Sequence, residues 1–153
     1  MLRRFSPAVL VATLLLATVP VAADSVPVIE GSISGVELCP QSICGSAIFT
    51  GQFTGLVNGR SERGVFLGAM THDPLPEPGD SAAITGGLWL IRTPRRALSG
   101  YVLPGGTLMN NGDNTFTIDM TMVLLRGGVG TLQFTGRLNH TPFPPTIIGT
   151  LSQ

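Results

Sequence analysis

The feature that most constrains the fold is a strict alternation of inward and outward side chains with a period of two residues. It is clearest in residues 115–126, where every second side chain from Phe116 to Leu124 is apolar and those between are Thr117, Asp119, Thr121 and Val123. Residues 46–58 repeat the pattern, with Gly51 and Gly55 among phenylalanines on the apolar side. This period predicts β-strands with one buried face, and no stretch shows an amphipathic helical period.

The alternating segments are separated by short, turn-like stretches, in a chain with 20 glycines and 12 prolines. Short turns join neighbouring antiparallel strands, and closing such a sheet removes its two exposed edges. We therefore expect an all-β fold, an eight-stranded antiparallel up-and-down β-barrel in which the first strand pairs with the last; a two-sheet β-sandwich is the alternative. The eight predicted strands are 26–37, 46–58, 64–72, 82–93, 97–109, 115–126, 130–140 and 146–152.

The first 23 residues have the pattern of a secretory signal peptide. Arg3 and Arg4 precede a short apolar run, and small residues at Val21 and Ala23 favour cleavage before Asp24. We expect a signal peptide at 1–23, a single β-barrel domain at 24–153, and a secreted or periplasmic location.

Charge excludes some partners. The chain has no lysine, and residues 24–153 hold seven arginines against nine acidic residues. This balance gives no basis for binding nucleic acid, or for membrane association after signal cleavage. No feature of the sequence specifies an oligomeric state.

The two cysteines, Cys39 and Cys44, are separated by four residues in "CPQSIC". In an exported chain this spacing predicts a structural disulfide across a tight turn. A thioredoxin-like redox site would have two intervening residues instead.

The two histidines begin matching motifs, "HDPLP" at His72 and "HTPFP" at His140. Each histidine is the last residue of a predicted strand, and in an up-and-down barrel both strands end at the same rim. Proline cannot donate to a strand ladder, so each motif ends its strand and forms a stiff loop. We predict a ligand-binding site formed by His72 and His140 over a wall that comprises Phe66, Met70, Phe134 and Leu138. The alternative is that both imidazoles bond to the rim backbone.

The same topology separates charge between the ends of the barrel. It places five arginines at one rim and five acidic residues, with both histidines, at the other. The first set is Arg60, Arg63, Arg95, Arg96 and Arg126; the second is Glu37, Asp73, Glu77, Asp80 and Asp113.

The segment "GGVGTLQFTG", residues 127–136, resembles the Gly-x-Gly-x-x-x-Phe-x-Gly strand region of allene oxide cyclase and dirigent-type barrels, which are calycin-like. The resemblance covers about ten residues and implies an eight-stranded barrel; it identifies no catalytic residue. Three functions follow as expectations: binding of a small apolar or amphipathic ligand, a cyclase-like or dirigent-like enzyme, or a structural module with a filled barrel. We expect no cofactor and no metal site.

Overall fold

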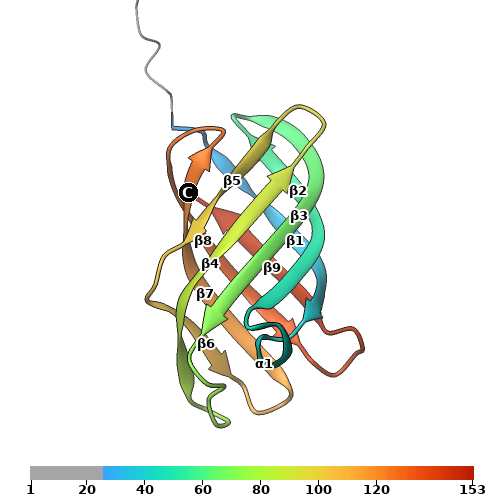
Figure 1. Cartoon of the computed structure of the whole chain (residues 1–153). Coiled ribbons are helices and arrows are strands. Elements are labelled where there is room, and N and C mark those ends of the chain that lie inside the picture. The colour runs from blue at the N-terminus through green and yellow to red at the C-terminus, as the bar shows by residue number, and fades with distance from the viewer. Residues whose placement is uncertain (1–25) are drawn as a thin grey trace, which may run out of the picture.

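Nine β-strands and one short helix make up residues 26–153, the part of the chain that the computed structural model describes (Figure 1). The helix α1 spans Gln41–Cys44. The strands are β1 (Ile29–Cys39), β2 (Ala47–Val57), β3 (Arg60–His72), β4 (Ser81–Arg92), β5 (Ala97–Val102), β6 (Gly106–Asn110), β7 (Thr115–Arg126), β8 (Gly130–Asn139) and β9 (Thr146–Ser152).

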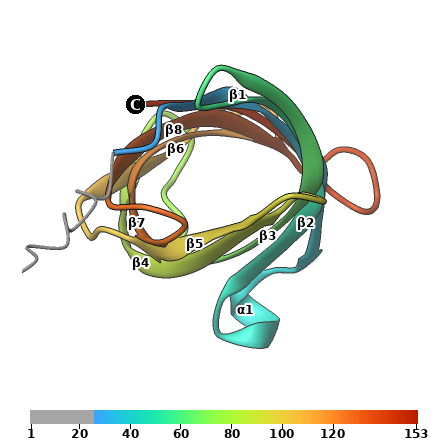
Figure 2. The same ribbon diagram turned by 90° about the horizontal axis from the view of Figure 1, so that it is seen from above.

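The strands form a closed antiparallel barrel. Neighbours along the chain pair with one another except for β5 and β6, and β1 pairs with β9 from Gly31 opposite Leu151 to Val36 opposite Thr146. Seen end on, the strands make a complete ring, with α1 projecting outside it (Figure 2). The predicted barrel and its closure by the first and last strands are confirmed, and the sandwich alternative is wrong. The predicted signal peptide lies outside the described residues.

One predicted strand is not continuous. Residues 97–109 form two strands, β5 and β6, which lie end to end in one position of the ring and both pair with β4 and β7. The interruption falls at Leu103–Gly105, where Pro104 has no amide hydrogen to donate and Gly105 adopts a φ of 103°. Nine strands therefore fill eight positions.

The barrel interior is filled by the alternating apolar side chains. The inward residues predicted for β7, from Phe116 to Leu124, are all buried. Glycines allow the large aromatic rings to fit: a Cβ at Gly149 would lie only 2.4 Å from the ring of Phe134. Glycine at an inward position thus lets a large aromatic ring lie close to the backbone of the neighbouring strand.

The two ends of the barrel differ in the loops that they carry. The mouth is the end at which β1, β3, β6 and β8 finish and where α1 lies; the far end is the opposite one, with the β2–β3, β4–β5 and β7–β8 turns. In Figure 1 the mouth is at the bottom, with α1 at its edge.

Candidate functional site

A pocket of about 310 Å³ opens at the mouth. Apolar side chains from several strands and loops form most of its surface, and both histidines contribute to it. Its lining residues are Glu37, Pro40, Gln41, Ser42, Ala47, Met70, His72, Pro74, Leu75, Leu108, Phe116, Leu138 and His140.

The predicted meeting of the two histidines at one rim agrees with the structure, since both line this pocket. Met70 and Leu138 also line it, as predicted. Phe66 and Phe134 lie deeper in the barrel, six residues before His72 and His140, and they line a separate cavity of only about 20 Å³. The open space is therefore confined to the mouth.

The most unusual group in the pocket is the carboxylate of Glu37, which is 5 % exposed. Its Oε2 lies 3.0 Å from Nε2 of His140, in an ion-pair contact. His140 also packs against Phe116, with ring centroids 5.1 Å apart, and its backbone amide donates to the carbonyl of Asn114. These contacts fix the imidazole over the carboxylate.

Burial raises the pKa of Glu37 above its ordinary value of 4.5, because removal from water disfavours the charged form. The charge and hydrogen-bonding capacity of His140 oppose this shift, and His72 opposes it at longer range. Glu37 and the two histidines thus act on one another electrostatically within one pocket.

The sequence predicts Glu37 at this rim, but Glu37 is not among the predicted ligand-binding residues. The signal was available: Ile29, Gly31, Ile33 and Gly35 are the inward positions of β1, and Glu37 continues that series. A carboxylate on an otherwise apolar strand face indicates a group with a special partner or function.

His72 is held by α1. The side-chain amide of Gln41 donates from Nε2 to the carbonyl of His72 at 2.7 Å, and its Oε1 accepts from the His72 amide at 2.8 Å. These two hydrogen bonds hold the last residue of β3, beyond Met70, where its pairing with β2 ends. The imidazole Nδ1 lies 2.5 Å from the carbonyl oxygen of Asp73.

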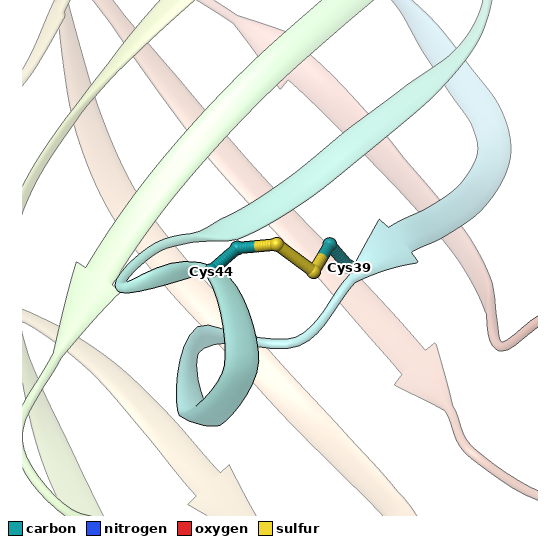
Figure 3. Close-up of a disulfide and its surroundings, with 2 residues drawn as sticks. All are labelled: Cys39 and Cys44. Atoms are coloured by element: carbon teal, nitrogen blue, oxygen red, sulfur yellow. A yellow bond between two sulfur atoms is a disulfide. The ribbon is translucent and has the colours of Figure 1, made fainter.

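The Cys39–Cys44 disulfide encloses the loop that carries Gln41. It joins the end of β1 to the end of α1, with a Cα–Cα distance of 6.1 Å (Figure 3). The predicted bond is confirmed, and Pro40, Gln41 and Ser42 within it line the pocket. A disulfide is consistent with an extracytoplasmic location; secretion by a signal peptide stays a prediction.

At the far end, a second buried glutamate is paired with arginine. Glu62 Oε1 lies 3.0 Å from Nε of Arg96, and Oε2 accepts a hydrogen bond from Oγ1 of Thr93 at 2.5 Å. This cluster fastens the start of β3 to the turn between β4 and β5.

Trp89 belongs to the barrel wall. Its side chain is buried, and the indole Nε1 donates to the carbonyl of Val123 across the barrel wall at 3.2 Å. The tryptophan therefore serves packing and does not line the mouth pocket.

Searches of protein-family models, curated proteins and solved structures find no match to this chain. Among residues 26–153, no helix is long and apolar enough to cross a membrane. Within the same residues, no three or more His, Cys, Asp and Glu side chains are grouped as a metal ion would require.

Proposed function

We propose that the protein binds a small apolar or amphipathic molecule in the mouth pocket. The observation that carries this proposal is an open, mainly apolar pocket of about 310 Å³ with a buried carboxylate–imidazole pair in its wall. Ligand sites combine apolar walls with a few placed polar groups in this way, and their volumes begin at about 300 Å³.

Closing the pocket entrance tests this function. Ser42 is exposed and lines the pocket, so Ser42→Trp would place an indole at the entrance without disturbing the core. Ser32→Trp is the matched control, because Ser32 is exposed on β1 and does not line the pocket. Native mass spectrometry of each protein from its own host would detect a retained small molecule.

Retention by the wild type and by Ser32→Trp, with loss in Ser42→Trp, would support binding at the mouth. No retained molecule in any of the three, together with no uptake of added octan-1-ol, would reject the proposal. A structural module with a filled barrel would then be the better description, since the interior below the mouth is already packed.

The Glu37–His140 pair favours a second candidate, an enzyme of the cyclase or dirigent kind. A buried carboxyl with a raised pKa beside an imidazole is suited to move a proton to or from a bound molecule. Chemical change of the retained molecule by the wild type, and its absence with Glu37→Gln, would separate enzyme from binding protein.

A further inference from the structure

The pocket's polar groups determine what a ligand head group must offer, and this inference rests on the binding function proposed above. Hydrogen-bonding side chains of five residues line the pocket: Glu37, Gln41, Ser42, His72 and His140. The Gln41 amide is occupied at both ends by the His72 backbone, and Glu37 and His140 face one another. Of the two imidazoles, that of His72 is therefore the one without a charged partner.

The hydrogen-bonding role of the His72 ring follows from its Nδ1 contact. The carbonyl oxygen of Asp73, 2.5 Å from Nδ1, can only accept a hydrogen bond, so Nδ1 must carry the proton. A neutral imidazole has one N–H, and hence Nε2 keeps a lone pair and acts as an acceptor. Among residues 26–153, no side chain or backbone group donates to this Nε2.

The ring nitrogen left without a partner in the pocket is thus an acceptor, Nε2 of His72. The Glu37 carboxylate is 5 % exposed and its Oε2 contacts His140, and Ser42 supplies a hydroxyl only at the exposed edge. A ligand carboxylate has no hydrogen to donate to Nε2 of His72 and would bring a charge into the apolar pocket. A ligand hydroxyl can donate to Nε2 without bringing a charge there.

We propose that the mouth pocket selects neutral aliphatic alcohols over carboxylates of the same length, with the ligand hydroxyl donating to Nε2 of His72. The volume sets the size of the apolar body. Because a water molecule occupies about 30 Å³ of liquid, the pocket accommodates roughly ten non-hydrogen atoms.

Isothermal titration calorimetry at pH 8 with three compounds tests the proposal on the full-length mature protein. Octan-1-ol and 1-methoxyheptane are isomers that differ in whether the oxygen can donate a hydrogen bond, and octanoate replaces the hydroxyl by a carboxylate. We expect octan-1-ol to bind about two- to tenfold more tightly than 1-methoxyheptane, the value of one hydrogen bond, and octanoate to bind more weakly than both.

His72→Phe removes the acceptor and keeps an aromatic ring of similar size. In this variant, octan-1-ol and 1-methoxyheptane should bind equally, while thermal melting followed by circular dichroism verifies the fold. Thr135→Ala, an exposed change on the outside of β8, is the control and should keep the wild-type preference.

The outcomes separate this inference from the function on which it rests. Equal binding of octan-1-ol and 1-methoxyheptane by the wild type, or tightest binding of octanoate, would overturn the alcohol selectivity but leave a ligand-binding pocket. An alcohol preference that survives in His72→Phe would overturn the role of His72. Failure of all three compounds to bind would overturn the alcohol selectivity, and together with no molecule retained from the host it would reject the binding function itself.

Discussion

The two ends of the barrel each bury a glutamate, and the two glutamates have different partners. Glu37 at the mouth and Glu62 at the far end are both 5 % exposed. Glu62 is paired with the guanidinium of Arg96, and Glu37 is paired with the imidazole of His140. Burial raises the pKa of Glu37, so the carboxyl at the mouth takes up a proton more readily than an exposed glutamate does.

The surroundings of the two pairs support this distinction. The Glu62 cluster is completed by the Thr93 hydroxyl, which also accepts from the amides of Arg95 and Arg96 and so ties the turn together. The Glu37 pair instead lies in the wall of an open apolar pocket. We infer that the far-end pair stabilises the barrel more than the mouth pair, in which the imidazole of His140 is partly exposed in the pocket wall.

The largest effect is expected from Arg96→Met, which leaves the Glu62 carboxylate buried without its counter-ion. Removing one partner of a buried ion pair lowers stability by about 3–5 kcal/mol. Because the Arg96 guanidinium is partly exposed, we expect a loss of about 3 kcal/mol. Urea denaturation at pH 7 measures it. Arg137→Met is the control, because the Arg137–Asp113 pair is exposed and should matter little. Equal losses of unfolding free energy in the two variants would show that the Glu62–Arg96 pair does not stabilise the barrel more than an exposed pair does.

Removing the Cys39–Cys44 disulfide tests how much this bond stabilises the mouth of the barrel. The double substitution Cys39→Ser and Cys44→Ser should lower stability by about 2 kcal/mol, the value expected for so short a loop. Because the loop carries Gln41, binding of octan-1-ol should weaken as well. Urea denaturation and calorimetry on the same sample measure both, and unchanged binding would show that the two Gln41 hydrogen bonds hold His72 without the disulfide.

A smaller loss is expected from His140→Phe, although it also removes the partner of a buried glutamate. The phenyl ring keeps the packing against Phe116, and the pKa of Glu37, already raised by burial, rises further without His140, which lowers the cost of protonating this carboxyl. We expect a loss of about 1 kcal/mol at pH 7 by urea denaturation. A loss as large as that of Arg96→Met would show that the two ends do not differ.

The smallest effect is a pH dependence. The pKa of Glu37 is higher in the folded chain than its ordinary 4.5, so the folded state binds more protons, and stability falls as pH rises above 4.5 through the folded pKa. Glu37→Gln should abolish this fall, so that the stability of the wild type relative to the variant decreases across that window.

Asp113→Asn provides a control of opposite sign. The pKa of Asp113 is lowered below 3.8, chiefly by the hydrogen bond from Thr115. The stability that the ionised Asp113 carboxylate contributes is therefore lost as pH falls below 3.8 through the folded pKa. Thermal melting across pH 3 to 8 would measure both differences. A wild type that gains stability over Glu37→Gln above pH 4.5 would contradict the raised pKa.

Much of the fold could be predicted because the alternation of side chains is a local property of each strand. The period of two residues identified the strands and their inward faces, and the short turns gave an order in which His72 and His140 had to reach the same rim. The cysteine spacing identified the disulfide. The interruption at Pro104 and Gly105 was missed, although both residues disfavour a regular strand, because the flanking segments alternate on either side of it.

The sequence by itself determined which side chains face inward, since every second residue of a strand points to the same side. Only the tertiary structure decided which inward groups meet. Glu37 and His140 are about a hundred residues apart, and their contact depends on β1 and β8 both finishing at the mouth, with β9 between them. Whether space remained there also depended on packing: the cavity beside the rings of Phe66 and Phe134 is only about 20 Å³, whereas the side chains at the mouth leave about 310 Å³ open.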